Sequence, residues 1–307
     1  MHQRLPRRSF TPVFIAISLV MQAPAACASE SFTLRKISES GVITIGFRDG
    51  SVPFSYLDAK RRPVGYSMDI CYRIADAVKQ QLKRPDLEVK LTPVTSATRV
   101  PLINNNIVDL ECGTTSNTTE RQKQVSYLVT TFVATGRLLT KRKSGINGLD
   151  DLRGKTVVST AGTTSIRNLD ELNASRKLEM NILAARDHAE AFQILETDRA
   201  VAFAMDDVLL VGLAAMSKKP DDYRVAGEPL SIEPYGVVVR KDDPEFKRLG
   251  DEAIVSMFRS GEIERLYRKW FQSPIPPKQV NLQLPMSPQL RKAIAQPSDS
   301  GDPNHYR

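Results

Sequence analysis

The sequence predicts an α/β fold with two lobes. Its 307 residues, 41% of them hydrophobic and 25% charged, have an ordinary globular composition and are enough for two separate cores. Apolar runs typical of buried strands alternate with segments of helical periodicity, which favours a largely parallel sheet covered on both faces. The same alternation starts again after an extended apolar run at 128–140, so a second α/β unit is expected there.

The first 28 residues have the pattern of a signal peptide and are left out of the predicted fold. Three arginines form a basic start, which is followed by an apolar run over residues 13–21. Residues 26–28 have the small side chains of a cleavage site. The apolar run is shorter than the roughly 20 residues of a spanning helix. We therefore expect an exported, soluble protein whose mature chain starts near Ser29.

Two details of this segment bear on how the chain is exported. The pair Arg7 and Arg8 resembles a twin-arginine signal, but paired arginines also occur in ordinary signal peptides, so both routes stay open. Cys27 raises the question of a lipid anchor, which we do not expect because Pro24 stands where such a signal has an aliphatic residue.

The charge of the chain favours small anions as ligands. The formal net charge is +8, and loss of Arg4, Arg7 and Arg8 with the signal peptide leaves +5. Lysines and arginines are interleaved with acidic residues instead of forming a basic stripe, which argues against a nucleic-acid partner. A general attraction for small anions fits this pattern better.

Cys71 and Cys112 are the two cysteines of the expected mature chain. An oxidising compartment allows them to pair as a disulfide. Two buried free thiols fit the sequence equally well, because cysteine is often a small core residue.

The first set of elements starts with a short helix that Gly41 ends, since glycine readily adopts the left-handed conformation found there. Apolar residues three and four apart predict the next helix. In chain order the set contains a helix over 34–40, a strand over 42–47, a helix over 69–81, a strand over 87–94, a helix capped by Thr95 and Ser96, and a strand over 108–112.

The second set follows the extended run. It contains a short helix over 149–153, a strand over 155–160, a helix opened by the loop 161–165, strands over 180–184 and 200–205, a last strand over 235–240, and two amphipathic helices over 244–258 and 261–271. Prolines from Pro274 onward predict an extended strap that ends in a disordered polar segment.

Residues 110–121, LECGTTSNTTER, have the pattern of an anion site. Asn117 as N-cap and Glu120 as its reciprocal partner predict a helix that starts near Thr118. The first N–H groups of a helix have no intrahelical partner and lie at the positive end of its dipole, so they stabilise a carboxylate. The alternative is an ordinary capped surface helix.

Side chains of the same stretch suit an amino acid. The planar guanidinium of Arg121 can hold a carboxylate through two hydrogen bonds, and the hydroxyls of Thr114 and Ser116 offer acceptors to a neighbouring ammonium. The loop 161–165, which includes Thr164, repeats the pattern of glycine and hydroxyl residues before a helix.

Further candidates follow predicted strands. Arg48 comes directly after the strand 42–47 and would point into the crevice where α/β sheets bind ligands; the alternative is a surface arginine. Ser96 and Arg99 are three residues apart and would lie on one helix face. Asp206, also at a strand end, suits an ammonium, and His188 at a helix start is either a donor to a carboxylate or a capping or exposed histidine.

Several of these stretches together resemble a known family, the family 3 solute-binding proteins of ABC importers. The resemblance covers nearly the whole mature chain and is specific only when its motifs are taken together. They are residues 45–56 (IGFRDGSVPFSY), 85–101 (PDLEVKLTPVTSATRVP), 110–124, 185–188, 205–207 and 269–282 (KWFQSPIPPKQVNL).

The resemblance implies a periplasmic binding protein-like type II fold, in which two α/β lobes joined by two crossover strands close over one amino acid. It places lobe 1 at residues 31–133 plus 236–275, lobe 2 at 137–230, and a C-terminal strap and tail at 276–307. It also implies a monomer that captures L-glutamate or L-aspartate for the membrane permease of an ABC importer. Neither catalytic residues nor a metal or cofactor are expected.

The same resemblance implies a role for each candidate. Arg121 and the backbone N–H groups of Ser116 and Thr164 would hold the α-carboxylate; Thr114, Ser116 and Asp206 the α-ammonium; Arg48, Ser96, Arg99 and His188 the side-chain carboxylate. Three arginines against one aspartate give this site a charge of +2, which suits a ligand of net charge −1. A neutral ligand would leave arginines desolvated without partners.

Enzymes and sensors are the competing classes. Ser165, His188 and Asp206 are the residue types of a hydrolase triad, but the chain has no GxSxG motif and their order gives no support. A periplasmic dehydratase on the same fold would need a hydrophobic pocket for a ring instead of three arginines. A ligand sensor would need a separate receptor as partner.

Overall fold

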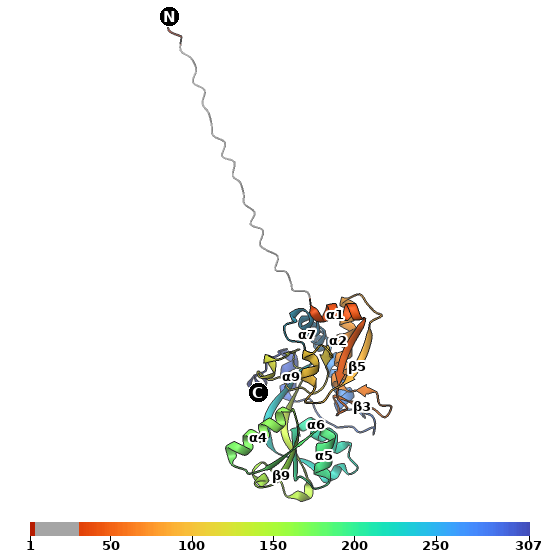
Figure 1. Cartoon of the computed structure of the whole chain (residues 1–307), viewed down its shortest axis with the longest axis vertical. Coiled ribbons are helices and arrows are strands. Elements are labelled where there is room, and N and C mark those ends of the chain that lie inside the picture. The colour runs from red at the N-terminus through yellow and green to blue at the C-terminus, as the bar shows by residue number, and fades with distance from the viewer. Residues whose placement is uncertain (4–30) are drawn as a thin grey trace.

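Two mixed sheets, one in each lobe, form the framework of the protein. The computed structural model describes residues 1–3 and 31–307, and its folded part consists of an upper and a lower α/β lobe (Figure 1). The residues that predict a signal peptide, including Cys27, fall within 4–30 and lie outside the described residues.

The first sheet has the strand order β5-β1-β6-β13-β7. Strand β1 (Val42–Phe47) pairs in parallel with β5 (Glu88–Pro93) and β6 (Leu110–Glu111). Strand β13 (Val238–Val239) then runs antiparallel to β6 and to β7 (Ser126–Tyr127). The sheet is therefore mixed, because the chain returns to it from the second lobe.

The second sheet has the order β10-β9-β11-β8-β12. Strands β10 (Asn181–Ala185), β9 (Thr156–Thr160) and β11 (Ala202–Asp206) are parallel. Strands β8 (Phe132–Lys141) and β12 (Tyr223–Tyr235) complete it in antiparallel pairing. The sequence did not predict β12, and only the start of the strand expected at 235–240 falls within it.

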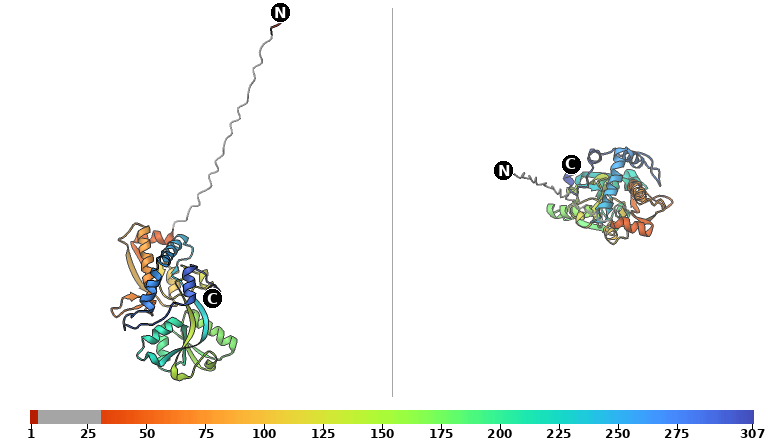
Figure 2. Two further views of the ribbon diagram at one scale, coloured as in Figure 1. Left: turned by 180° about the vertical axis from the view of Figure 1, so that it is seen from behind. Right: turned by 90° about the horizontal axis from the view of Figure 1, so that it is seen from above.

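The paired strands β8 and β12 carry the chain between the lobes. Phe132 lies opposite Tyr235 and Gly136 opposite Ser231, with a register shift between Ala226 and Ser231. Seen from behind, these strands cross from the upper to the lower lobe side by side (Figure 2).

Helices cover both sheets: α1, α2 and α7 lie in the upper lobe, and α4, α5 and α6 in the lower lobe (Figure 1). Gly41 ends α1 with φ 73°, as predicted. The helices are α1 (Phe32–Ser40), α2 (Tyr66–Gln81), α3 (Arg99–Asn104), α4 (Thr164–Arg176), α5 (His188–Glu196), α6 (Asp207–Ala215), α7 (Pro244–Arg259), α8 (Glu262–Phe271) and α9 (Pro288–Ala295). The short strands β2 (Gly50–Ser51), β3 (Ser55–Leu57) and β4 (Pro63–Val64) form a third sheet.

The C-terminal segment is ordered, so the predicted disordered tail is wrong. Helix α9 and the 3-10 helix η5 (Pro303–Tyr306) pack against the crossover strands, where Ala293 and Tyr306 contact Val133 and Ile232. The buried Tyr306 hydroxyl lies 2.8 Å from Thr130 Oγ1. The C-terminus consequently lies where the two lobes meet (Figures 1 and 2).

The described helices include none that is both long and apolar enough to cross a membrane. The longest among them, α2 and α7, carry charged residues along their exposed faces.

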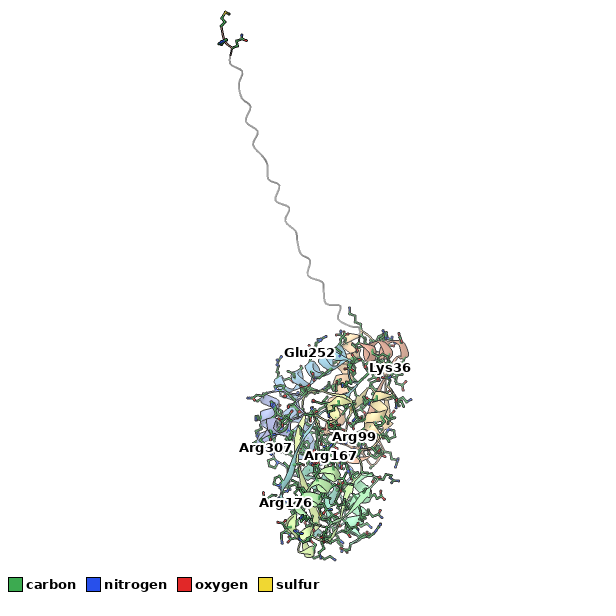
Figure 3. All side chains as sticks on the ribbon, turned by 60° about the vertical axis from the view of Figure 1, so that its left-hand side comes forward. Lys36, Arg99, Arg167, Arg176, Glu252 and Arg307 are labelled. Atoms are coloured by element: carbon green, nitrogen blue, oxygen red, sulfur yellow. A yellow bond between two sulfur atoms is a disulfide. The ribbon has the colours of Figure 1, made fainter. Side chains whose placement is uncertain are left out.

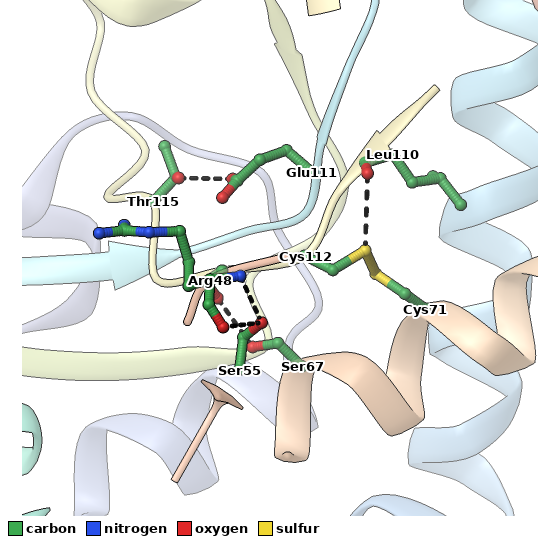
Figure 4. The surroundings of a disulfide bond; sticks show 9 residues. Arg48, Ser55, Ser67, Cys71, Leu110, Glu111, Cys112 and Thr115 are labelled. Atoms are coloured by element: carbon green, nitrogen blue, oxygen red, sulfur yellow. Dashed lines mark hydrogen bonds between the residues drawn. A yellow bond between two sulfur atoms is a disulfide. The ribbon is translucent and has the colours of Figure 1, made fainter. Parts of the chain in front are cut away.

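Cys71 in α2 and Cys112 just after β6 form a disulfide, which decides between the two alternatives that the sequence left open (Figure 4). Both residues are fully buried. The bond ties α2 to the end of the strand that leads into the loop 113–117.

We expect a Cys71→Ala/Cys112→Ala variant to lose about 3–4 kcal/mol of unfolding free energy, because the disulfide joins residues 41 positions apart and restricts the unfolded chain. Urea denaturation followed by circular dichroism, with and without reductant, measures this loss. Wild-type protein should fall to the stability of the variant when it is reduced. Equal midpoints for oxidised and reduced wild type would contradict the expectation.

Candidate functional site

The predicted ligand-binding residues come from both lobes and meet at the cleft between them. Most of them line one small cavity, together with Thr163 and Met205: Ser96, Arg99, Thr114, Ser116, Thr164, His188 and Asp206. Arg48 lines an adjoining cavity that shares His188. Arg99 lies near the middle of the folded part, where the lobes meet (Figure 3).

The helix predicted near Thr118 is wrong. Residues Arg121–Lys123 form only a 3-10 turn, η1. The Asn117 N–H donates to Pro234 O, and its side-chain amide donates to Asp299 O, so Asn117 is engaged by other segments and caps no helix. The loop runs beside β12, and any anion here is held by side chains and loop N–H groups, since no α-helix begins at this loop.

The second predicted loop does open a helix. Thr163 is the N-cap of α4, and its hydroxyl accepts from the Ile166 N–H. Gly162 has φ 75°, and a Cβ there would lie 3.0 Å from the Ala97 backbone of the opposite lobe. Glycine therefore allows this helix start to come close to the other wall of the cleft.

Hydrogen bonds across the cleft hold the lobes in a closed arrangement. Arg121 donates to Ser116 O of its own lobe (2.9 Å) and to Gly162 O of the other lobe (3.2 Å). Ser116 Oγ lies 3.3 Å from Thr164 Oγ1, also across the cleft. Arg121 is half-buried, whereas the two hydroxyl residues are buried.

Beside these contacts, polar atoms are buried without a protein partner among the described residues. Around the two cavities they are the donor groups Arg48 Nη1, Ser96 Oγ, Arg99 Nε and His188 Nε2, and one acceptor, Glu111 Oε1. The two arginine groups are donors only. The neutral imidazole of His188 can donate from Nε2, and the Ser96 hydroxyl can donate as well. Such a set fits an acceptor-rich group such as a carboxylate.

Burial alters the acid–base properties of these groups. It lowers the pKa of Arg99 to about 9, an effect that the nearby Arg121 reinforces and Glu111 opposes. Burial also lowers the pKa of Arg48, with Glu111 again opposing. The pKa of His188 falls well below its ordinary value because of burial and the charges of Arg48 and Arg99.

Asp206 forms the opposite, acidic end of the cavity. Its carboxylate accepts hydrogen bonds from the Tyr235 hydroxyl and from Ser165 Oγ (3.2 Å). Burial and the neighbouring Glu233 nevertheless raise its pKa to about 8. A cation placed beside Asp206 would stabilise the ionised form and lower that pKa.

Sequence reasoning missed three residues next to this site: Glu111, Glu233 and Tyr235. Glu111 is fully buried, accepts from Thr115 Oγ1 (2.6 Å) and lies beside Arg48 (Figure 4). The sequence signal for Glu111 was a charged residue inside an apolar strand. Glu233 and Tyr235 lie on β12, a strand that the sequence did not predict.

These carboxylates change the charge balance of the site. The sequence count of three arginines against one aspartate left out Glu111 and Glu233, both of which are buried near the cavity. The preference for an anion therefore rests on the unpartnered donors around Arg48 and Arg99, and no longer on a net charge of the whole site.

A hydrolase triad is not formed. Ser165 Oγ donates directly to Asp206, whereas His188 Nδ1 lies 2.8 Å from Thr160 Oγ1. The histidine therefore does not stand between serine and aspartate. Nor do the described residues contain a group of three or more His, Cys, Asp or Glu side chains placed to hold a metal ion.

Comparison with known proteins gives consistent relatives. The family model described as bacterial extracellular solute-binding proteins, family 3, matches residues 43–273. The L-glutamate/L-aspartate-binding protein of Pseudomonas aeruginosa is 50% identical over 92% of this chain and 94% of its own length. The glutamate/aspartate import solute-binding protein of Escherichia coli (strain K12) is 46% identical over 97% of this chain and 99% of its own.

Solved structures share the fold at lower identity. A solute receptor for L-cysteine of Neisseria gonorrhoeae has a TM-score of 0.68 and 26% identity, covering 77% of this chain and 92% of that one. The ancestral amino acid-binding protein AncCDT-1, a precursor of cyclohexadienyl dehydratase, has a TM-score of 0.67 and 25% identity, covering 78% and 100%. These likenesses agree with the predicted type II binding-protein fold.

We expect the His188 imidazole to titrate with a pKa well below its ordinary value of 6.5, because burial and two nearby guanidinium groups disfavour its charged form. NMR of protein labelled on histidine, with a His188→Gln variant to assign the signal, measures its titration. A midpoint near the ordinary value of 6.5 would contradict the burial of this imidazole beside Arg48 and Arg99.

Proposed function

The chain belongs to the bacterial extracellular solute-binding proteins of family 3, and we propose that it captures L-glutamate or L-aspartate between its lobes and delivers it to an ABC importer. Like its close relatives, it is a binding protein and not an enzyme. The observation that carries the choice of an acidic ligand is the group of buried donors without protein acceptors around Arg48, Arg99 and His188.

In this proposal, the side-chain carboxylate of the ligand is held by lobe 1 and one residue of lobe 2. Arg48, Ser96 and Arg99 supply donors from one wall, and His188 supplies a donor from the other. Thr160 beside Nδ1 orients the imidazole; when the Thr160 hydroxyl donates, Nε2 carries the hydrogen and faces the cavity as a donor. A neutral side chain would leave the two arginines without a charged partner, which is costly in a buried site.

The α-groups of the ligand would bind at the other end of the cavity. Arg121, with the N–H groups of Ser116 and Thr164, takes the α-carboxylate, and Thr114, Ser116 and Asp206 take the α-ammonium. Arg121 donates to Ser116 O and Gly162 O and does not line the cavity of Thr164 and Asp206, so its remaining N–H groups would have to reach the α-carboxylate from the cleft entrance. This end reads groups that every amino acid has.

The proposal includes the larger organisation of the chain. Lobe 1 corresponds to residues 31–133 plus 236–275 and lobe 2 to 137–230, a division supported by the two sheets and by the crossover pairing of β8 with β12. Residues 1–28 act as a signal peptide that directs the protein to the periplasm, where it works as a monomer that meets a membrane permease.

We expect isothermal titration of the mature protein to give at least about 100-fold tighter binding for L-glutamate and L-aspartate than for L-glutamine or L-arginine, since about 3 kcal/mol separates a paired from an unpaired buried charge. Before titration, the protein is unfolded and refolded to remove any bound amino acid. Arginine or glutamine binding as tightly as glutamate would sink the assignment.

We expect Arg48→Ala to weaken L-glutamate binding about 100-fold and L-glutamine binding less than 10-fold, because the substitution removes a partner of the side-chain carboxylate alone. Arg248→Ala, an exposed arginine on α7, is the matched control and should change neither affinity. Equal losses for both ligands would show that Arg48 does not contact the side chain.

A further inference from the structure

Glu233 is a buried carboxylate on a crossover strand that the proposed ligand contacts do not use. It lies two residues before the end of β12, opposite Ala134 of β8, and is 2% exposed. It is not among the residues that line the cavity of Thr164 and Asp206. Its place is behind the cleft wall.

Three donors converge on this carboxylate. Thr164 Oγ1 donates to Oε2 at 2.7 Å, while Ser231 Oγ (2.5 Å) and Asn168 Nδ2 (3.2 Å) donate to Oε1. An ionised carboxylate can only accept hydrogen bonds, so the hydroxyl hydrogen of Thr164 is committed to Glu233.

This commitment sets the direction of the hydrogen bond across the cleft. Ser116 Oγ and Thr164 Oγ1 are 3.3 Å apart, and either could donate to the other if they were isolated. Because Thr164 gives its hydrogen to Glu233, Ser116 must be the donor to Thr164. Both residues line the cavity, and the remaining lone pairs of their hydroxyl oxygens are then acceptors, which suits a cation.

We infer that Glu233 is a positioning residue for the ligand's ammonium group: it holds the Thr164 hydroxyl, and through it the Ser116 hydroxyl, as acceptors toward the cavity. The inference rests on the proposed function, since it specifies how the α-ammonium end of that site works. Glu233 acts through Thr164 and does not touch the ligand.

The same carboxylate fastens the cleft wall to the crossover strands. Ser231 lies opposite Gly136 of β8, and a Cβ at Gly136 would collide with Ser231 Oγ. Glycine at this position therefore leaves room for the serine hydroxyl that donates to Glu233. The start of α4, through Thr164 and Asn168, is tied to β12 at the point where the lobes are joined.

The electrostatics around Asp206 agree with an ammonium end. Burial, and after it the charges of Glu233 and Asp207, raise the pKa of the Asp206 carboxyl, while the Tyr235 hydroxyl and Ser165 Oγ act to lower it. An ammonium group beside Asp206 would be attracted by both Asp206 and Glu233, since these carboxylates share a low-dielectric surrounding.

The test compares two ligands in a Glu233→Gln variant. L-Glutamate carries the ammonium, whereas glutarate has both carboxylates and lacks it. Glutamine offers one acceptor oxygen to the three donors, so the Thr164 hydroxyl is no longer fixed. We expect L-glutamate binding to weaken about 10-fold and glutarate binding to stay unchanged or become tighter. Each ligand is titrated separately by calorimetry, glutarate at millimolar concentration.

Glu228→Gln is the matched control, because it makes the same chemical change at an exposed position of β12. It should leave both affinities as in wild type. Thr164→Val is a second variant, useful if Glu233→Gln folds poorly; it removes the hydroxyl itself and should give the same selective loss of L-glutamate. The melting temperature of each variant checks its folding.

A change of less than threefold in the ratio of glutamate to glutarate affinity, in Glu233→Gln and in Thr164→Val, would overturn the inference. This includes the case in which both ligands weaken equally, as expected of a purely structural role. Failure of wild-type protein to bind acidic amino acids would instead overturn the proposed function, so the two failures are distinguishable.

Discussion

Charged groups buried where the lobes meet are the constraint on which this site depends. Arg48 and Arg99 are nearly as buried as core residues, and a desolvated guanidinium without a partner is strongly unfavourable. Glu111, held by Thr115, offsets part of this cost from within lobe 1. The remaining donors lack protein acceptors among the described residues, so an anionic ligand stabilises the closed arrangement that buries them.

The parts of the fold that sequence predicted are those in which local pattern and tertiary contacts agree. Strand β1 is a continuous apolar run and helix α7 has strong helical periodicity, and both end close to their predicted bounds. Strand β12 contains Gly227 and Pro229, which break a strand pattern, and it exists because β8 offers a continuous partner. The capping-box pattern at 117–120 failed for the same reason, since Pro234 and Asp299 bind Asn117 in place of a helix.

The candidate site could be predicted to a similar extent. Arg48 directly follows β1 and Asp206 ends β11, and ligands of α/β sheets bind at such strand ends; the roles of both residues remain predictions. Glu111 and Glu233 carried no comparable signal. One lies in a two-residue strand and the other on a strand defined by pairing, so their proximity to the arginines and to Asp206 depends on contacts between segments far apart in the chain.

Strand β12 both joins the lobes and carries residues of the candidate site. With β8 it sets how the lobes approach each other, and it also carries Tyr235 to Asp206 and Glu233 to Thr164. Recognition of the ammonium end is thus built on the crossover strands themselves, so a shift of these strands would move the acceptors as well. Arg48 and Arg99 lie on lobe 1, outside the crossover strands. The groups proposed for the side-chain carboxylate and those proposed for the ammonium therefore lie on different elements of the fold.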